Sequence, residues 1–251
     1  MSLIPGMLQA TPWAAGETRI ALALLLTVAL AVVARGIRAV TTGGAVAGTV
    51  LTFTMLAAGM GTFAAVATVF LLAWGSTLWR RTRKQRMGVG EGSGGRRGIQ
   101  IVANLGAAAG AAVLWAVTGQ AGFLLALASA LAEAAGDTVS SECGQALAHR
   151  ARLVTTWESV AAGVDGAVSL PGTAAGVAGA VIVAAVCAAA GVISARQTGW
   201  AAGAATMGIF ADSYLGASLQ RRRLLSNDGV NFISTILAGT LGFLCARWAP
   251  R

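Results

Sequence analysis

Residues that carry metal, redox or proton chemistry are scarce in this chain. It contains one histidine, His149, and three scattered cysteines, Cys143, Cys187 and Cys245. An odd number of cysteines without regular spacing excludes a disulfide framework, and one histidine with isolated thiols argues against a zinc site. The N-terminus lacks a basic segment followed by a small-residue cleavage site, so Ile20–Ala34 is expected to be a retained helix and not a signal peptide.

Acidic residues are also few, and their positions are unusual. The chain has nine of them in 251 residues, at a mean hydropathy of +0.74. All except Glu17 and Glu91 lie inside or beside long apolar stretches. A carboxylate is costly to hold in a membrane, and for that reason it usually serves a function there.

Apolar residues dominate what the chain does contain, at 56% of the sequence with 34 glycines. No repeat with a period of about 20–50 residues is visible, and the polar segments are too short to enclose this much apolar surface. These features exclude a soluble repeat protein and a low-complexity linker. We predict an all-α, polytopic transmembrane helical bundle that forms a single integral membrane domain over residues 1–251.

About eight spans are expected, some of them short or broken. Helices in lipid associate through small residues, and Gly172, Gly176 and Gly179 are candidates for such contacts. The expected spans are Ile20–Ala34, Ala45–Met60, Thr62–Trp79, Ile99–Val117, Gly122–Ala135, Thr173–Ala195, Gly199–Leu219 and Val230–Ala246.

The net charge of +9 would suggest nucleic acid as the partner of a soluble protein, but the positions of the basic residues indicate a membrane topology instead. By the positive-inside rule, the side with more basic residues faces the cytoplasm of a bacterial inner membrane, and both termini lie outside. The same residues have a simpler role as topology signals that contact lipid headgroups. Fourteen of the 18 basic residues lie on this side: Arg35, Arg38, the seven in Arg80–Arg97, Arg150, Arg152 and Arg221–Arg223.

A cluster of carboxylates and hydroxyls follows the fifth apolar stretch. On a continuous helix Glu133 and Asp137 lie about 40° apart, whereas Glu142 lies about 140° from Asp137. We therefore expect a helix break near Gly136 or Thr138–Ser141 that brings the three carboxylates to one ion. Oxygen ligands of this kind suit Mg²⁺.

The longest polar segment, residues 80–98, is basic and glycine-rich and is expected to form a cytoplasmic loop. It lacks the strand and the Gly-Lys-Ser/Thr ending of a Walker A loop. A flexible hydrophilic loop and a loop that contacts phosphate or nucleotide both remain open. For Asp137 and Glu142 the alternative is helix capping or pairing with Arg150 or Arg152.

Two further segments on the same side have related chemistry. Asp165 lies in a glycine-rich turn directly before an apolar span, where free N–H groups at a helix start can hold an anion. Asp212 lies within an expected membrane helix that exits at Arg221–Arg223. Carboxylates, free N–H groups and basic residues at one membrane face are the components of a site for a metal–polyphosphate.

Six motifs occur in order along the chain: RGIRAVTTGGAVAG at 35–48, RRGIQIVANLG at 96–106, AGDTVSSECG at 135–144, DGAVSLPGTAAG at 165–176, ADSYLGASLQ at 211–220 and VNF at 230–232. The most specific are Asp-Thr-x-x-Ser-Glu-x-Gly from Asp137 and Asp-Ser-x-x-Gly-Ala-x-x-Gln from Asp212. Together the motifs resemble an integral-membrane family that includes the TMEM19 proteins and the plant and cyanobacterial phytyl-phosphate kinases. Val139 and Cys143 depart from the family pattern, and both are expected to alter packing or lipid fit before catalysis.

The resemblance implies Mg²⁺-dependent phosphoryl transfer from a nucleoside triphosphate, ATP or CTP, to an isoprenyl monophosphate, which becomes the diphosphate. Asp137, Glu142 and Asp212 would be the catalytic metal ligands, with Arg97 as a further catalytic residue. A phosphate monoester is already an anionic nucleophile near neutral pH, so no general base is needed. The residues expected to bind nucleotide or substrate are Lys84, Arg96, Gln100, Asn104, Ser141, Asp165, Ser213, Gln220 and Asn231.

Other functions use the same residue types. In a CTP-dependent nucleotidyltransferase, a lipid phosphate attacks the α-phosphorus and forms a CDP-lipid. A lipid or anion transporter also carries intramembrane acids and broken helices, although here the acids lie at one face and not at the midplane. The amides Gln100, Asn104 and Asn231 have an alternative role in satisfying neighbouring helix backbones. Nucleic acid is not an expected partner, and a second copy of the chain, as a homodimer, remains an open one.

Overall fold

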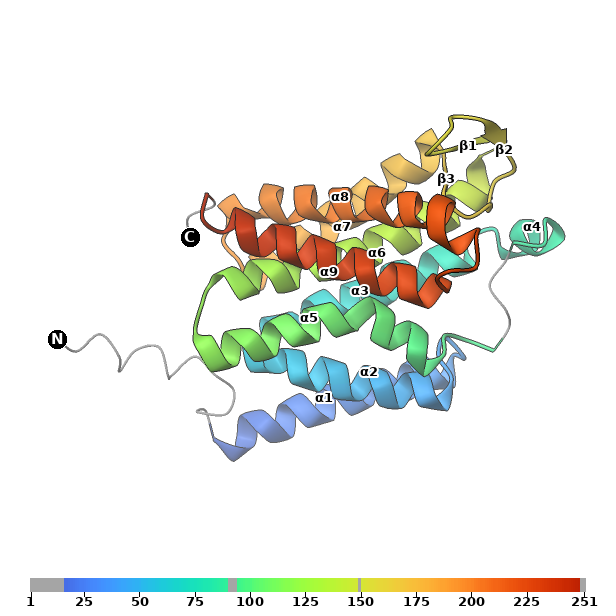
Figure 1. The fold of residues 1–251 in the computed structure, drawn as a ribbon. Helices are drawn as coiled ribbons and strands as arrows, with labels where there is room; N and C mark the ends of the chain where they lie inside the picture. The colour runs from blue at the N-terminus through green and yellow to red at the C-terminus, as the bar shows by residue number, and fades with distance from the viewer. Residues whose placement is uncertain (1–15, 90–93, 149, 249–251) are drawn as a thin grey trace.

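The computed structural model describes residues 16–89, 94–148 and 150–248, and eight long helices lie side by side in it (Figure 1). Six of them are long and apolar enough to cross a membrane, and residues 42–58 form a shorter apolar helix. The prediction of an all-helical membrane bundle is confirmed. The eight are α1 (Glu17–Gly36), α2 (Thr42–Met55), α3 (Gly61–Leu78), α5 (Gly98–Thr118), α6 (Gly122–Leu147), α7 (Leu170–Ala189), α8 (Thr198–Leu215) and α9 (Asn227–Cys245).

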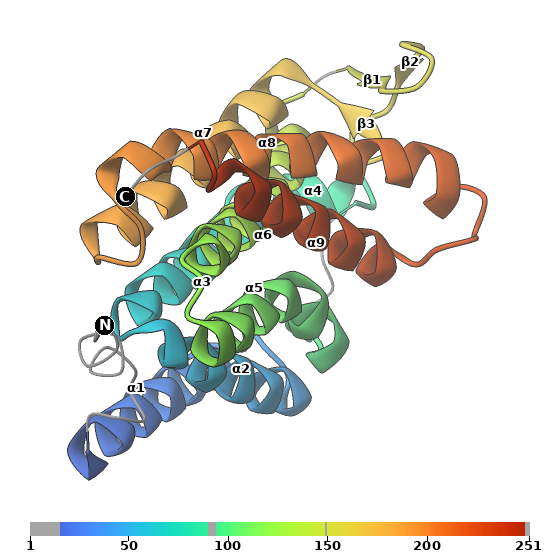
Figure 2. The same cartoon turned by 60° about the vertical axis from the view of Figure 1, so that its left-hand side comes forward.

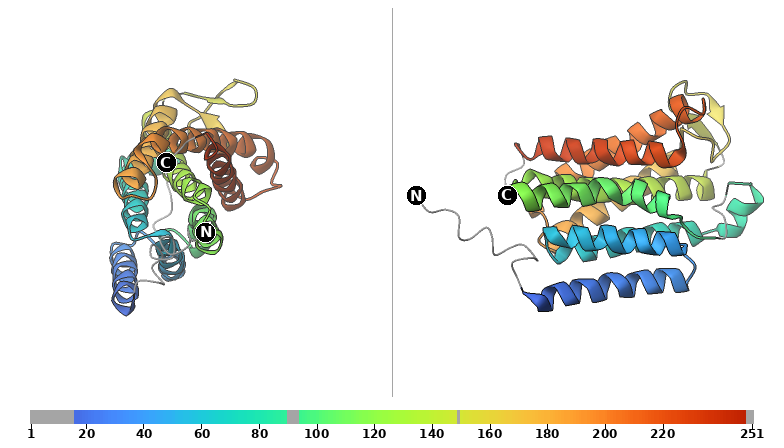
Figure 3. Two further views of the ribbon diagram at one scale, coloured as in Figure 1. Left: turned by 90° about the vertical axis from the view of Figure 1, so that its left-hand side faces the viewer. Right: turned by 60° about the horizontal axis from the view of Figure 1, so that its bottom comes forward.

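The helices alternate in direction along the chain, so α1 begins and α9 ends at the same end of the bundle (Figure 3). The opposite end carries the short helix α4 (Arg81–Arg86) and a small sheet (Figure 1). Each of the predicted basic clusters falls in a connection at this second end, which we call the basic end. His149 and Glu91, the acidic residue of the glycine-rich loop, lie outside the described residues.

Helix α6 forms the centre of the bundle, in contact with α3, α5, α7, α8 and α9 (Figure 2). Of the 18-residue apolar stretch of α6, 83% is buried inside the protein, against 17% for the corresponding stretch of α1. On α1, Leu25 and Val32 are 65% and 64% exposed, which is typical of a face that contacts lipid. The acids that follow the fifth apolar stretch therefore lie on the most enclosed helix of the protein.

Glycines bring α7 against α6, as the sequence predicted. A Cβ atom added at Gly176 would lie 2.6 Å from the Cβ of Ser140, and one added at Gly172 would lie 2.8 Å from the Ser140 carbonyl oxygen. At Gly179 the corresponding distance to Val139 is 3.4 Å, an ordinary contact. Close backbone approach at Gly172 and Gly176 thus replaces the side-chain interdigitation of most soluble helix pairs.

Two local features differ from the sequence prediction. Helix α6 runs without a break from Gly122 to Leu147, so the expected interruption near Gly136 is wrong. The chain between α6 and α7 forms three short antiparallel strands, β1 (Ala151–Leu153), β2 (Ser159–Val160) and β3 (Ala167–Val168), in the order β2-β1-β3. Strands of two or three residues are too short to show an alternating pattern.

Replacement of Gly176 by leucine is expected to lower the thermal stability of the detergent-purified protein, because the new side chain has no space against Ser140. Overpacking of this kind costs about 1–3 kcal/mol. The control is Gly203→Leu on α8, where the glycine is exposed and an added Cβ meets nothing within 4 Å. Equal losses of melting temperature in the two variants would contradict the role given to the α6–α7 contact.

Candidate functional site

A polar pocket of about 170 Å³ opens at the basic end, between α6, α7, α8 and the sheet segment. It unites six of the residues predicted from the sequence: Asp137, Ser141, Asp165, Asp212, Ser213 and Gln220. Polar residues that the sequence reasoning did not select also line it, namely Ser140, Gln145, Ser169, Thr173 and Asn227. Side chains from four separate segments thus meet in one small volume.

Asp165 reaches the pocket because the neighbouring Gly166 lets this turn contact the end of α8. Gly166 has a φ of +74°, and a Cβ added there would lie 2.3 Å from the Ala217 nitrogen. Ala217 belongs to a π-helical turn, Gly216–Gln220, that ends the helix after Asp212. A π turn rotates the following side chains relative to a regular helix, and such turns are frequent at functional sites. Here the turn places Gln220 in the pocket wall.

Helix α7 begins at the same pocket. Its N-cap is Ser169, whose Oγ accepts a hydrogen bond from the N–H of Gly172 at 3.2 Å, and Pro171 lies in the first turn. Ser169, Gly172 and Thr173 line the pocket. The positive end of the helix dipole therefore faces the carboxylates, an arrangement that favours an anionic ligand between them.

Asp212 belongs to a hydrogen-bond network with α9 and α5. Ser234 donates to Asp212 Oδ2 at 3.3 Å and to the Asn231 carbonyl oxygen at 3.0 Å. The Asn231 amide lies between Asp212 and Asn104. Turned one way, its nitrogen is 3.5 Å from Asn104 Oδ1; turned the other way, it is 3.3 Å from Asp212 Oδ2. Asn104 also donates to the Gln100 carbonyl oxygen at 2.7 Å. The two predicted asparagines therefore connect α5 to the pocket.

A fourth carboxylate, Glu133, lies behind the pocket, on the same face of α6 as Asp137. Glu133 is 1% exposed, and among the described residues neither of its oxygens has a hydrogen-bond partner. Gly208 of α8 makes room for it, since a Cβ there would lie 2.6 Å from Glu133 Cγ. Asp137 and Asp212 are both close enough to repel its charge. A buried carboxylate without a hydrogen-bond partner, beside two half-buried ones, requires a cation or protons.

The oxygen atoms of the polar pocket fit a hard divalent cation that is held by two carboxylates. Within the described ranges, no three acidic, histidine or cysteine side chains are grouped closely enough to hold an ion. Mg²⁺ commonly takes one or two carboxylates and completes its shell with water and substrate phosphate. Asp137 and Asp212 match that pattern, and the hydroxyls around them match a hydrated ion.

Glu142 does not join them. Because α6 is continuous, Glu142 faces α3 and α4, where it forms an ion pair with Lys84, and Thr77 Oγ1 donates to its other oxygen at 2.9 Å. Lys84, the only lysine of the chain, is 1% exposed. It also donates to the carbonyl oxygens of Ser76 and Thr77 at 2.9 and 2.8 Å. All three ammonium hydrogens are therefore used, and this geometry favours a structural role for Lys84 and Glu142 over nucleotide or metal binding.

The remaining predicted residues lie at the start of α5. Gln100 accepts a hydrogen bond from the Arg97 backbone N–H at 2.7 Å and so caps the helix. The Arg97 side chain is 68% exposed and lies 3.6 Å from Asp228 of α9. The charge of Arg96 acts on Asp137 of α6. The positive charge of Arg96 therefore acts on the acidic pocket, whereas the Arg97 side chain lies at the surface.

Sequence signals were present for two of the pocket residues that were missed. Ser140 follows Asp137 by three residues, which puts both on one face of α6. Ser169 precedes Pro171 and an apolar run, the usual sequence of an N-cap. Ser234 and Asn227 come from α9, and only the packing of α9 on α8 reveals them.

The fold and the pocket define a class: polytopic helical membrane proteins with carboxylates gathered in a pocket at one end of the bundle. The chain belongs to the family of integral membrane proteins designated DUF92, which it matches over residues 25–239. The family resemblance carried by the six motifs is thereby confirmed.

Three relatives illustrate the range of the family. The chain is 32% identical to the chloroplastic protein VTE6 of Arabidopsis thaliana over 78% of its own length, and 40% identical to an uncharacterized membrane protein of Methanocaldococcus jannaschii over 53%. It is 31% identical to an uncharacterized membrane protein of Synechocystis over 63% of its length. The matches cover 62%, 56% and 63% of these relatives, less than two thirds of each. No solved structure matches the chain.

Removal of either member of the Lys84–Glu142 pair is expected to destabilise the protein, because the other charge stays buried without its partner. The expected loss for Lys84→Met or Glu142→Gln is about 3–5 kcal/mol, and the double variant Lys84→Met/Glu142→Leu should recover much of it. Thermal unfolding in detergent provides the measurement, with Arg86→Met, at an exposed position of α4, as the control. Single variants that melt like the native protein would refute the structural role.

Proposed function

We propose that the protein is a membrane phosphotransferase that moves the γ-phosphoryl group of a nucleoside triphosphate onto an isoprenyl monophosphate. The observation that carries this proposal is the convergence of Asp137, Asp165 and Asp212 at the start of α7 in one polar pocket. Carboxylates opposite a helix N-terminus suit a triphosphate with its metal. The family resemblance to phytyl-phosphate kinases supports the acceptor and the reaction.

The reaction needs no proton acceptor in the pocket. A phosphate oxygen of the acceptor attacks the γ-phosphorus, the bond from the γ-phosphorus to the β–γ bridging oxygen breaks, and a nucleoside diphosphate leaves with that electron pair. The histidine of this chain is not required, because the nucleophile is already ionised. The task of the protein is to hold two anions in line and to offset their repulsion.

Asp137 and Asp212 would hold Mg²⁺, and Ser140, Ser141 and Ser213 would donate to its waters or to phosphate oxygens. Bound there, the ion would neutralise charge on the transferred group. The N–H groups at the start of α7 supply fixed positive potential on the other side of the pocket. Ser234 and Asn231 orient Asp212, so its carboxylate is in place before any ligand binds.

The positive-inside rule orients the basic end toward the cytoplasm, where nucleoside triphosphates are available. The proposed location is therefore a bacterial plasma membrane, with the polar pocket on the cytoplasmic side. Six long apolar helices and the alternating directions of all eight agree with an even number of crossings.

Substitution of Asp137 or Asp212 by asparagine should reduce turnover at least about 100-fold, because the isosteric amide removes the charge that a cation needs. Melting temperature should stay unchanged or rise, since each substitution relieves repulsion around Glu133. The control is Glu158→Gln, an exposed carboxylate outside the pocket. Turnover retained in both aspartate variants would remove the metal assignment.

The reaction itself is tested with purified protein in detergent, Mg²⁺, geranylgeranyl or phytyl monophosphate, and ATP or CTP labelled at the α or the γ position. Label from the γ position should appear in an isoprenyl diphosphate. Label from the α position alone would instead identify a nucleotidyltransferase. With no labelled lipid from either donor, the same substrates in sealed proteoliposomes would test transport without chemical change.

A further inference from the structure

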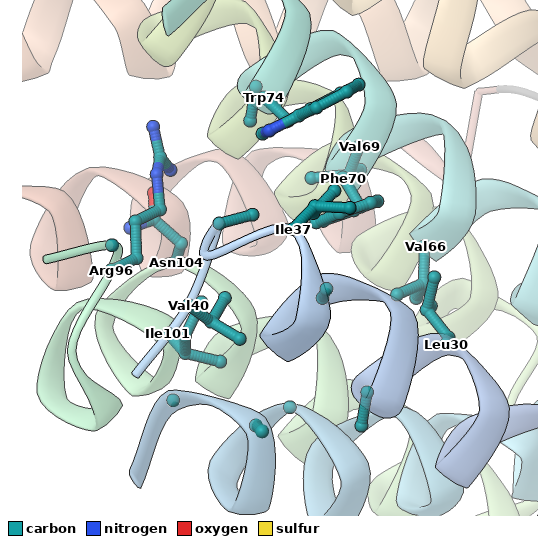
Figure 4. Close-up of a pocket in the computed structure, with 18 of the residues that line it drawn as sticks. Leu30, Ile37, Val40, Val66, Val69, Phe70, Trp74, Arg96, Ile101 and Asn104 are labelled. Atoms are coloured by element: carbon teal, nitrogen blue, oxygen red, sulfur yellow. The ribbon is translucent and has the colours of Figure 1, made fainter. Parts of the chain in front are cut away.

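A second cavity, distinct from the polar pocket, lies among α1, α2, α3 and α5. Its volume is about 340 Å³, twice that of the polar pocket, and its lining is mostly apolar (Figure 4). Leu30, Val66 and Ile101 form part of its wall, and Phe70 and Trp74 lie on another side of it from Arg96 (Figure 4). We call it the apolar cavity.

Three arginines line the apolar cavity where it reaches the basic end: Arg38, Arg81 and Arg96. Within residues 16–89, 94–148 and 150–248, the side chains that line it include no aspartate or glutamate. Guanidinium groups bind phosphate oxygens through paired N–H donors, and three of them match the charge of about −2 on a phosphate monoester better than the single charge of a phosphodiester. The chemistry of this end therefore favours a monophosphate headgroup.

The α1–α2 turn is held in the position that presents Arg38 beside Arg96. The Arg96 N–H donates to the Ala39 carbonyl oxygen at 2.9 Å, and the Thr41 N–H donates to the Arg96 carbonyl oxygen at 3.0 Å. Arg38 itself has a positive φ of 57°, a left-handed conformation that is unfavourable for a residue with a side chain. Gly95 makes the approach possible, since a Cβ there would lie 2.6 Å from the Arg38 carbonyl oxygen.

The length of the cavity suits one lipid chain in one leaflet. Along α1 it extends from Arg38 back to Thr27, which corresponds to roughly 16 Å at about 1.5 Å per residue. That is about half of a hydrocarbon core some 30 Å thick. Small residues, among them Ala31, Ala34 and Gly48, line it and leave room for a chain between the helices.

The apolar cavity adjoins the polar pocket through two residues. Asn104 lines the apolar cavity, and the Asn231 amide lies between it and Asp212 and can bond either one. Arg96 also lines this cavity, and its charge acts on Asp137. A headgroup at the three arginines would thus lie on the side of the bundle that faces the acidic pocket. The family motifs at 35–48 and 96–106 both supply residues that line the apolar cavity, so both would contribute to binding the headgroup.

We propose that the apolar cavity is the acceptor site: it holds a single-chain isoprenyl monophosphate, with the chain along α1 and the phosphate on Arg38, Arg81 and Arg96. This assignment rests on the proposed phosphotransferase function and adds where the acceptor binds. The polar pocket then serves the nucleotide, and the two substrates approach each other at Asn104 and Asn231.

Binding of tritiated geranylgeranyl monophosphate to the purified full-length protein in detergent, without nucleotide, tests the assignment separately from turnover. Arg38→Gln should weaken binding about tenfold, the effect of losing one charged hydrogen bond. Ala31→Trp, which fills the cavity, should weaken it at least as much. The matched controls are Arg35→Gln, from the exposed end of α1, and Val32→Trp, on the lipid-facing side of α1. Both should bind like the native protein.

Gel filtration establishes that each variant is folded, and Arg81→Gln replaces Arg38→Gln if that variant is not. Native affinity in either the arginine variant or Ala31→Trp would overturn the assignment, because head and chain must both be in the cavity. Equal competition by phosphatidic acid would also overturn it and indicate a general phospholipid site. Tight, variant-sensitive binding without any γ-label transfer would leave the cavity assigned and refute the kinase instead.

Discussion

The cost of keeping carboxylates away from water is the constraint on which the rest of this structure depends. Glu142 meets that cost with Lys84 and Thr77, and the pair ties α4 and the end of α3 to the central helix. Glu133, Asp137 and Asp212 have no such basic partner in direct hydrogen-bond contact among the described residues. The first arrangement is complete as it stands, whereas the second is completed only by a ligand or by protons.

Glycine geometry explains how so many acids meet near one face. The α6–α7 contact at Gly172 and Gly176 brings the start of α7 against Asp137, and Gly208 leaves space for Glu133 between α6 and α8. Gly166 brings the Asp165 turn to the π-helical end of α8. A side chain at any of these positions would separate the elements that form the pocket. The abundance of glycine is therefore a requirement of the site as well as of helix packing in lipid.

Much of this architecture could be predicted from the sequence. Apolar length located the eight helices, and basic residues located one end of the bundle, because both signals are carried by consecutive residues. The partner of Glu142 could not be predicted, since Lys84 lies 58 residues away in a loop whose helix α4 is only six residues long. The expected break in α6 was inferred from a need for three converging carboxylates. The helix is instead continuous, so Glu142 faces Lys84 and only Asp137 of this pair lines the polar pocket.

In the proposed reaction, the two cavities would divide the chemistry between a water-soluble and a lipid-soluble anion. The polar pocket combines acids with a helix N-terminus and suits a ligand that arrives with its own cation. The apolar cavity is lined by three arginines at its basic end and suits a lipid anion from the bilayer. Placing both substrates among the same charges would expose each phosphate to carboxylates or leave the metal without ligands. Under this proposal, separation by the Asn104–Asn231 pair would avoid the conflict, because neutral amides can contact either phosphate and repel neither.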